Sequence, residues 1–449
     1  MPLSRRELFA FAFVSVPLAL GGLPLVLYLT PYYAAASDMS LATIGFVLLL
    51  TRLGDIVTDP LIGVWSDRTP ARLGRRALWI APGLPVMAVG TIAVFDPWAA
   101  LTPGYLWWAV SALYLGWTLI GIPLAAWVAE RSPDYHARSR LAGARNWGGV
   151  IGALLAILAP LLISVLAANG LTAAAAESPG SLQPMLKVLA WMTVGLLCIA
   201  VPVLIKAAPQ PAFRPRPRLP FKTGLRVLLA NRPFRLLLLS GVCAALGWNA
   251  INALFLFYVT VWLGADASQW PLIILAYMLG QVVGTPLIVK LAPRYAKHRM
   301  LAVCSMISIA VFALTLWLER GDWMGYCAIN LVTGLLAPSI AILGPSMAAD
   351  VIDADELASG QQRAALFMAL WGMLDKAAVA LATAIMLALA QALGFDPSMP
   401  SDAATASALR YVFSLMPIGF FLISIALIWH YPLDQAGQRE LRRALARGE

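Results

Sequence analysis

The strongest constraint on the fold is a long succession of apolar stretches. Hydrophobic residues make up 61% of the 449 positions and charged residues only 12%, with a mean hydropathy of +0.79. A soluble domain carries about 25% charged residues, and a membrane-spanning helix takes about 20 apolar residues. The sequence therefore excludes a water-soluble fold and predicts an all-α polytopic membrane protein with twelve transmembrane helices. The predicted spans are 8–33, 40–65, 77–95, 104–129, 145–168, 186–206, 234–262, 269–291, 300–318, 323–347, 366–393 and 408–430.

A segment rich in proline and basic residues separates the spans into two sets of six. We predict an N-terminal six-helix bundle over 1–206, a cytoplasmic linker over 207–232, a C-terminal six-helix bundle over 233–432 and a basic cytoplasmic tail over 433–449.

The net charge of +10 follows the alternation of loops. Loops 34–39, 96–103, 169–183 and 263–268 contain no Lys or Arg, whereas the loops between them are basic, with Arg320 as the exception. Short cytoplasmic loops hold the basic residues, so both termini are predicted to be cytoplasmic in a bacterial-type cytoplasmic (inner) membrane. The basic loops are interpreted as topology signals and contacts to anionic lipid, and no nucleic-acid partner is expected.

Residues 54–62 and 280–288 form an internal repeat. Glycine, valine, proline, leucine and isoleucine recur at one constant offset, and each copy runs into a basic loop. Repeated halves of this kind are typical of secondary transporters. Asp55 and Asp59 of the first copy are Gln281 and Thr285 in the second, so the acids are specific to the first half.

Asp55 and Asp59 stand four residues apart and therefore on one helix face. Two such carboxylates resist ionisation in a low dielectric unless a cation or proton balances them. The pair predicts a cation site. The alternative is that Asp59 caps its helix or pairs with Arg52 or a loop arginine.

Lys376, with Asp375 beside it, is the other ionisable group well inside an apolar run. A buried lysine needs a partner, and this one would neutralise the acidic pair when the ion is absent. A lysine that snorkels from a shorter helix is the alternative. Thr118, just before Gly121 and Pro123, could donate a hydroxyl oxygen to the site or bond its own backbone.

Three stretches, Arg52–Arg76, Ile122–Arg145 and Ala349–Lys376, resemble the glycoside-pentoside-hexuronide:cation symporters of the major facilitator superfamily. The resemblance covers essentially the whole chain. It implies a major facilitator fold of two six-helix halves that rocks around a midplane site and couples solute uptake to Na⁺ or H⁺, with Li⁺ possible, and no cofactor.

The resemblance also implies roles for individual residues. Asp55 and Asp59 match the cation-binding carboxylates, Thr118 matches a further ion ligand and Lys376 matches the coupling lysine. Thr58 stands where an amide ligand is common, which leaves the preferred ion open.

The resemblance implies a sugar or glycoside as the small solute. Its galactoside-binding acids are missing, because segment 1 has none inside it and the segment 4 position is Gly121. A lysophospholipid or other amphipathic solute, as carried by animal relatives, stays open. Packing or interface anchoring is the alternative role for each tryptophan. The substrate-binding candidates are Trp127, Arg145, Asn146, Trp248, Asn249, Asn252 and Tyr258.

Charged residues at the cytoplasmic side are predicted to form ion pairs that hold the gate in its inward or outward state. The acidic run between segments 10 and 11 could also suggest a metal site. Surface pairs are individually weak, but a bistable gate needs only a small bias. The predicted gating residues are Asp67, Arg68, Arg72, Arg75, Arg76, Asp350, Asp353 and Arg363.

Two other functional classes are alternatives to cation-coupled symport. An intramembrane enzyme would need a nucleophile, base or metal set, but the three histidines sit at segment ends, the four cysteines are unpaired in sequence and no catalytic motif is present. A non-transporting receptor or scaffold would be expected to have lost Asp55, Asp59 and Lys376. The sequence therefore predicts a transporter, functional as a monomer, that is not an enzyme.

Overall fold

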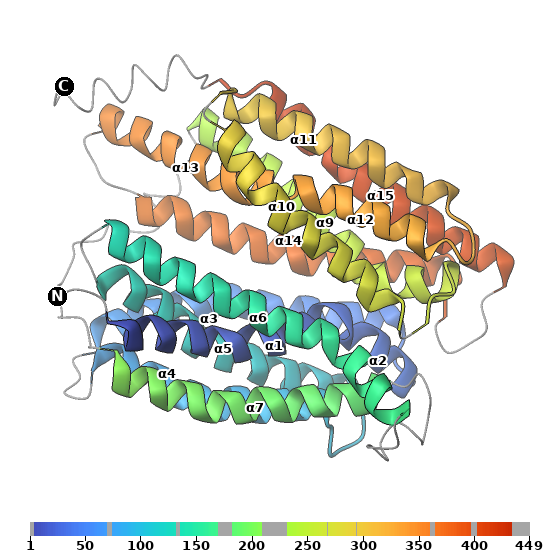
Figure 1. Cartoon of the computed structure of the whole chain (residues 1–449), viewed down its shortest axis with the longest axis horizontal. Helices are drawn as coiled ribbons and strands as arrows, with labels where there is room; N and C mark the ends of the chain where they lie inside the picture. The colour runs from blue at the N-terminus through green and yellow to red at the C-terminus, as the bar shows by residue number, and fades with distance from the viewer. Residues whose placement is uncertain are drawn as a thin grey trace. The chain divides into compact units, whose positions relative to one another are not determined.

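The computed structural model describes residues 4–69, 74–131, 135–168, 182–208, 231–266, 268–292, 294–359, 364–396 and 402–432. Side chains at 67–68, 75, 129–131, 135–140, 142, 160–168, 345, 349, 353–359 and 364–369 are not described. All regular secondary structure in the described part is helical (Figure 1). The helices are α1 Arg5–Leu27, α2 Leu29–Ala36, α3 Leu41–Arg68, α4 Arg75–Phe95, α5 Pro103–Arg131, α6 Tyr135–Ala168, α7 Leu182–Ala207, α9 Arg232–Phe257 with the π-helical turn Tyr258–Trp262, α10 Trp270–Leu291, α11 Lys297–Phe312 with the 3₁₀ turn Ala313–Trp317, α12 Trp323–Leu336, α13 Pro338–Ser359, α14 Ala364–Ala392 and α15 Ala403–Trp429.

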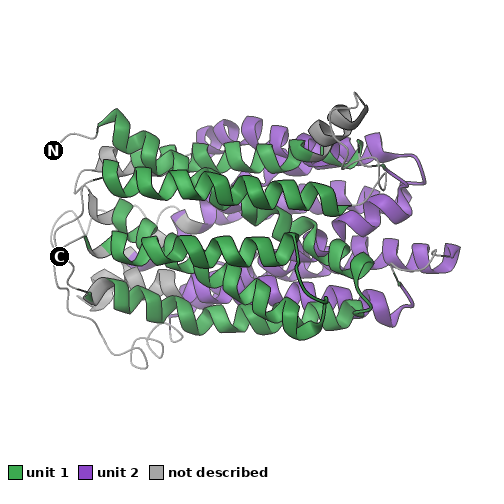
Figure 2. Cartoon of the chain, turned by 90° about the horizontal axis from the view of Figure 1, so that it is seen from below, with its two compact units in different colours: residues 1–215, 266–271, 396–400 green, residues 216–265, 272–395, 401–449 purple. Residues whose placement is uncertain are grey.

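The chain divides into two compact units, coloured separately in Figure 2. Unit 1 comprises 1–215, 266–271 and 396–400, and unit 2 comprises 216–265, 272–395 and 401–449. Helices α1 to α7 belong to unit 1, and α9 to α15 belong to unit 2 apart from the first residues of α10.

Eleven helical segments among the described residues are long and apolar enough to cross a membrane. Helix α6 contributes a shorter apolar stretch, Gly143–Ala159, within its 34 residues. Large apolar side chains form exposed faces in both units, including Val57 at 61% and Leu422 at 55%. Such faces suit lipid rather than water, and the predicted all-α membrane architecture is confirmed.

Several helix starts are explained by capping side chains. Ser40 accepts a hydrogen bond from the backbone N–H of Thr43 at the start of α3, and Asp402 accepts one from Thr405 at the start of α15. A short polar side chain at the N-cap satisfies a backbone donor that has no partner within the helix.

Two predicted single spans are each built from two helices. The first is divided at Tyr28, between α1 and α2, and the tenth at Ala337, between α12 and α13. At the second break, Ala337 keeps α-helical backbone angles (φ −56°, ψ −36°). The helical hydrogen-bond pattern is interrupted because Pro338 has no N–H to donate to the carbonyl of Gly334.

Two helices extend well beyond the predicted apolar segments. Helix α6 begins at Tyr135, nearly three turns before the predicted start at residue 145, and α13 continues to Ser359. The acidic run that includes Asp350 therefore lies on a helix rather than in a loop. Its Ala, Glu and Leu residues have high helix propensity, so the helix continues after the apolar pattern ends.

Each unit has its own apolar core, and small residues bring helix backbones into contact. A Cβ atom on Gly148 of α6 would collide with the carbonyl oxygen of Ala12 in α1, and one on Gly284 of α10 would collide with that of Leu335 in α12. In membranes, such small residues permit the close approach from which helix association gains most of its packing energy.

The adjacent glycines of α6 give a matched test of this packing. Gly148→Ala should lower stability by about 1–3 kcal/mol because the new methyl group overpacks the α1–α6 contact. Gly149→Ala should be neutral or slightly stabilising, because no atom lies within 4 Å of the added Cβ. Thermal unfolding of the two variants in detergent measures the difference, and equal melting temperatures would contradict the described α1–α6 contact.

Candidate functional site

A polar stripe on α3 faces a second polar stripe on α5. Arg52, Asp55 and Asp59 stand three, four and seven residues apart on α3, and Tyr114 and Thr118 stand four apart on α5. These spacings put each set on a single helix face. All five residues belong to unit 1, where the two stripes make contact.

Asp55 is 5% exposed and forms an ion pair with Arg52. The Nη1 atom of Arg52 donates to Oδ2 of Asp55 over 3.2 Å, and the guanidinium carbon lies 3.8 Å from the centre of the Tyr114 ring. The ring supplies a cation–π contact from α5. One positive charge is thus held directly beside the more buried acid.

Asp59 is linked to α5 by the Thr118 hydroxyl, which donates to its Oδ1 over 2.9 Å. Thr118 is 5% exposed, and Asp59 is half-buried. Of the two roles that the sequence left open for Thr118, contact with the acidic site is the one that the structure shows. Thr58 is half-buried, and as the immediate neighbour of Asp59 it points about a quarter turn away.

The arrangement brings oxygen atoms of two carboxylates and one hydroxyl to the same region of two helices. Oxygen ligands of this kind bind hard cations, and each carboxylate can also take up a proton. Arg52 balances one of the two negative charges, so a single added cation or proton would complete the neutralisation that an apolar environment favours.

The second copy of the repeat has no charged residue at the positions of Arg52, Asp55 and Asp59, which are Met278, Gln281 and Thr285. Thr285, which corresponds to Asp59, donates its hydroxyl to the carbonyl of Gln281 in its own helix over 2.8 Å. Gly280 and Gly284 place the α10 backbone directly against α12. In the first copy, a Cβ on Gly54 would meet nothing within 4 Å.

Lys376 is half-buried on α14, and the adjacent Asp375 is exposed. Both belong to unit 2, whereas the acidic stripe belongs to unit 1. The role of Lys376 in charge balance therefore remains a prediction.

The predicted solute-binding residues fall into different environments. Trp127 is fully buried and packs edge-on against Phe11 at 5.8 Å, and Tyr258 is fully buried with its hydroxyl on the carbonyl of Thr315 at 2.9 Å. Trp127 therefore has the packing role that the sequence left open, and Tyr258 likewise lies in a core. Asn249 donates to the carbonyl of Ala245 in its own helix over 2.8 Å.

The remaining solute candidates are more accessible. Arg145 and Asn146 are adjacent on α6, half-buried and exposed respectively. The Nε atom of Arg145 is buried and makes no hydrogen bond within the described part of the chain. Asn252 and Trp248 are half-buried on α9, and Trp248 lines a pocket within unit 2.

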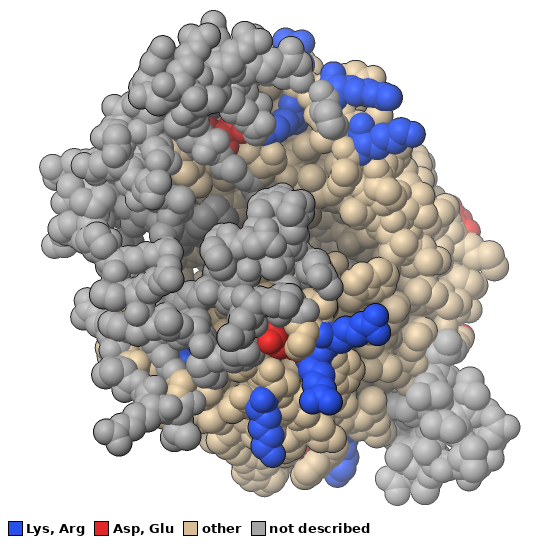
Figure 3. All heavy atoms as spheres, turned by 60° about the vertical axis from the view of Figure 1, so that its left-hand side comes forward, with Lys and Arg blue, Asp and Glu red and all other residues tan. Residues whose placement is uncertain are grey.

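Two of the predicted gating residues have described contacts. Arg76 is 1% exposed and donates from Nη1 to the Ser66 hydroxyl over 3.0 Å. Asp350 is 4% exposed, and its Oδ2 lies 2.5 Å from Nζ of Lys297. On the face drawn in Figure 3, Lys and Arg side chains of the described residues lie in several separate places. Arg72 and Arg363, and the side chains of Asp67, Arg68, Arg75 and Asp353, lie outside the described residues.

Three contact residues were not among the predicted site residues. The spacing of Arg52 to Asp55, and of Tyr114 to Thr118, places each beside a predicted ligand, and this spacing is a signal that could have found them. Lys297 lies 53 residues from Asp350 in sequence, so no local pattern indicates that pair.

Comparison with known proteins gives one coherent family. A family model described as MFS/sugar transport protein matches residues 10–435. The glucuronide carrier protein homolog of Escherichia coli is 23% identical over 431 residues, covering 92% of this chain and 90% of that protein. The sodium-dependent lysophosphatidylcholine symporter 1 of Gallus gallus is 23% identical over 479 residues, covering 99% and 89%. The solved structure of the nucleoside transporter NupG aligns with a TM-score of 0.69 at 13% identity, covering 94% of this chain and 98% of that chain.

The contact of Lys297 with Asp350 should be far more important for stability than the exposed contact of Lys187 with Asp96. Lys297→Met removes an ammonium group from beside a nearly buried carboxylate and should cost about 1–3 kcal/mol. Lys187→Met acts on a lysine that is 57% exposed and should cost about 0–1 kcal/mol.

Thermal unfolding of both variants tests this difference. Combining Lys297→Met with Asp350→Leu should recover part of the loss, because it removes the buried carboxylate as well. Equal costs for the two single variants would show that the α11–α13 pair contributes no more than a surface contact.

Proposed function

This chain belongs to the MFS/sugar transport protein family, and from that premise we propose that it is a Na⁺-coupled symporter of a sugar or glycoside. It has the major facilitator fold of two six-helix halves and is an integral membrane transporter, not an enzyme. The observation that supports the coupling is the hydrogen bond from Thr118 to Asp59, which joins α3 to α5 beside the buried Asp55.

The proposed cation site uses carboxylate oxygens of Asp55 and Asp59 and the hydroxyl oxygen of Thr118, with Thr58 as a further ligand if α3 rotates. Uncharged and anionic oxygens suit Na⁺ better than they suit a large or soft ion. A proton on either carboxylate would give the same net charge, so H⁺ is the coupling ion to test against Na⁺. The similarity to a sodium-dependent symporter supports Na⁺ as the first choice.

Arg52 is proposed to hold the site in its ion-free state. Its guanidinium already balances Asp55 at 3.2 Å, so a cation that binds Asp55 competes with a positive charge for the same oxygen. Movement of Arg52 away from Asp55 would require a new partner for the arginine. Lys376 is proposed to provide the corresponding charge balance from unit 2.

A sugar or glycoside is the proposed solute because the family is one of sugar transport proteins and a glucuronide carrier homolog is among the relatives. Arg145 and Asn146 of α6 are the preferred solute contacts. Asn146 is exposed, and the Nε atom of Arg145 is buried without a hydrogen bond to the described residues. A lysophospholipid is the second candidate, supported by the match to the lysophosphatidylcholine symporter over 99% of this chain.

The proposed topology places both termini in the cytoplasm of a bacterial-type inner membrane, with the basic linker and tail on that side. The segments concerned, 209–230 and 433–449, lie outside the described residues. The proposed functional form is the monomer, without a nucleic-acid partner.

Transport by purified protein in liposomes tests the function. Labelled glucuronides, other glycosides and lysophosphatidylcholine are offered under an imposed Na⁺ or proton gradient. We expect accumulation of a glycoside driven by Na⁺, and a loss of at least tenfold in Asp59→Asn. The matched control is Thr285→Val, which alters the corresponding position of the second repeat and should keep gradient-driven accumulation.

Ion binding is measured separately by the shift of the melting temperature with NaCl in place of choline chloride. Thr118→Val should weaken Na⁺ binding roughly tenfold because it removes a hydroxyl oxygen from a charged site, whereas Thr118→Ser should retain it. Accumulation driven by a proton gradient alone would show that the coupling ion is H⁺ and not Na⁺. A Thr118→Val variant with unchanged Na⁺ response would overturn the proposed site.

A further inference from the structure

Arg410, about two turns into the apolar helix α15, has no ion-pair partner among the described residues. The side chain is half-buried, and its Nε atom is buried without a hydrogen bond to the described part of the chain. An arginine within a membrane-spanning helix is costly unless an opposite charge or several acceptors compensate it. Its position therefore indicates an anion that these residues do not supply.

Two aromatic side chains hold the guanidinium group of Arg410. Its carbon atom lies 4.4 Å from the centre of the Trp262 ring and 4.8 Å from the centre of the Tyr411 ring. The indole N–H of Trp262 donates to the carbonyl of Leu318 over 2.8 Å. The Nη2 atom of the arginine donates to the Tyr411 hydroxyl over 3.1 Å, which is its one hydrogen bond within the described part of the chain. A guanidinium fixed by stacking can bind the oxygens of a phosphate through its remaining N–H groups.

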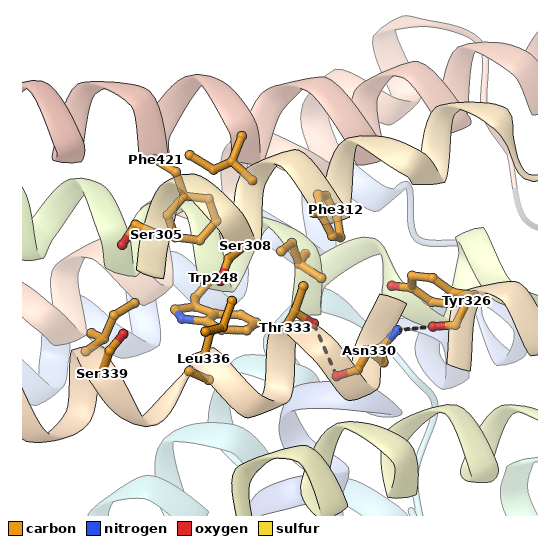
Figure 4. A pocket seen from close by; sticks show the side chains of 14 residues that line it. Trp248, Ser305, Ser308, Phe312, Tyr326, Asn330, Thr333, Leu336, Ser339 and Phe421 are labelled. Atoms are coloured by element: carbon orange, nitrogen blue, oxygen red, sulfur yellow. Dashed lines mark hydrogen bonds between the residues drawn. The ribbon is translucent and has the colours of Figure 1, made fainter. Parts of the chain in front are cut away.

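An aromatic cluster fixes the turn that carries Trp262 against α15. Tyr258, at the start of this π-helical turn, stacks on Phe413 of α15 with the ring centroids 4.1 Å apart. Phe413 also contacts Phe312 and Tyr326, two of the side chains labelled in Figure 4. The indole that stacks on the guanidinium is thus positioned by packed elements before any ligand binds.

The exposed face of α15 places this guanidinium at the level of lipid head groups. Four residues that are about half exposed lie on that face at spacings of four and seven, namely Tyr411, Leu415, Leu422 and Trp429. Tyr411 and Trp429 are 18 positions apart, which corresponds to about 27 Å along the helix and is close to the roughly 30 Å of the hydrocarbon core. Tyrosine and tryptophan concentrate at the two membrane interfaces. The hydroxyl of Tyr411, and the arginine bonded to it, therefore lie where lipid phosphates are found.

A second arginine lies against the same turn. A Cβ atom on Gly264 would be 3.0 Å from the Nε atom of Arg320, which is exposed. Glu319 and Asp322 of the adjoining loop form no ion pair with either arginine within the described part of the chain. Asp322 instead accepts the backbone N–H of Glu319 over 2.9 Å. Two arginines without a described counter-ion thus flank one turn.

Membrane topology does not account for these two arginines. Short cytoplasmic loops hold the basic residues, whereas the neighbouring loops 263–268 and 394–407 contain no Lys or Arg. Arginines on such a side do not serve as orientation signals. Binding of an anion at the membrane surface gives both of them a role.

We propose that Arg410, assisted by Arg320, binds the phosphodiester group of a membrane phospholipid at the end of unit 2 where α15 begins. The phosphate oxygens accept hydrogen bonds from the remaining N–H groups of Arg410, and the acyl chains lie along Leu415 and Leu422. The bound molecule is a structural lipid distinct from the transported solute, so the proposal does not depend on which solute is carried.

Photolabelling of the full-length protein, stripped of lipid in a maltoside detergent, tests the proposal. The probe is a phosphatidylglycerol that carries a diazirine beside one acyl ester. We expect saturable labelling of peptides within 258–264 or 407–415, identified by mass spectrometry. Unlabelled phosphatidylglycerol should compete, whereas diacylglycerol with the same chains, which lacks the phosphate, should compete at least tenfold less well. Displacement of the probe by soluble glycerol phosphate at the same concentration would identify a site for free phosphate and overturn the lipid proposal.

Arginine variants give the matched control. Arg410→Gln should reduce labelling of these peptides at least fivefold because it removes the charged donor. Arg299→Gln removes an exposed arginine from α11 and should leave this labelling unchanged. If Arg410→Gln fails to fold, as judged by thermal unfolding, Tyr411→Phe replaces it and should reduce labelling roughly threefold, because the guanidinium loses the hydroxyl that orients it. Labelling that does not saturate, equal competition by diacylglycerol, or labelling that persists in the site variant would overturn the proposal.

Discussion

The cost of placing charge in an apolar environment determines the organisation of unit 1. An ionised carboxylate in the middle of a spanning helix must be balanced by a cation, a proton or a basic side chain. Asp55 meets this need with Arg52, and the arginine is itself held over the ring of Tyr114 on the neighbouring helix. The second acid, Asp59, is linked to that same helix through Thr118. The contact between α3 and α5 is thus partly an arrangement of charge, and it can change when the charge changes.

The two copies of the repeat contact their neighbouring helices in different ways. In unit 2, Gly280 and Gly284 bring the backbones of α10 and α12 together, and Thr285 bonds within its own helix. In unit 1, the position of Gly284 is Thr58, and space remains around Gly54. Backbone contact through glycine depends on shape alone and does not respond to ions. The polar contact between α3 and α5 depends on the charges of its side chains, to which the proposed cation or proton would be added.

Much of this could be predicted from the sequence, because spans and related halves follow from hydropathy and repetition. Asp55, Asp59 and Thr118 were predicted from spacing and resemblance, and the structure brings Thr118 to Asp59. The sequence did not show which acid Arg52 contacts, because helical spacing permits several partners. It also did not separate the buried Trp127 and Tyr258 from the half-buried Trp248, since an aromatic residue in an apolar helix has the same pattern in a core, at a lipid face or in a pocket.

The contrast between the two helix pairs has a consequence for how such a protein diverges. A pair joined by glycine backbones tolerates few substitutions, because almost any larger residue at Gly284 would meet the carbonyl of Leu335. A pair joined by side chains can exchange one hydrogen-bonding group for another without moving its backbones. If the proposed cation site lies in the first half, new ion preferences are expected to arise by substitution there, while the packing of the second half stays constant.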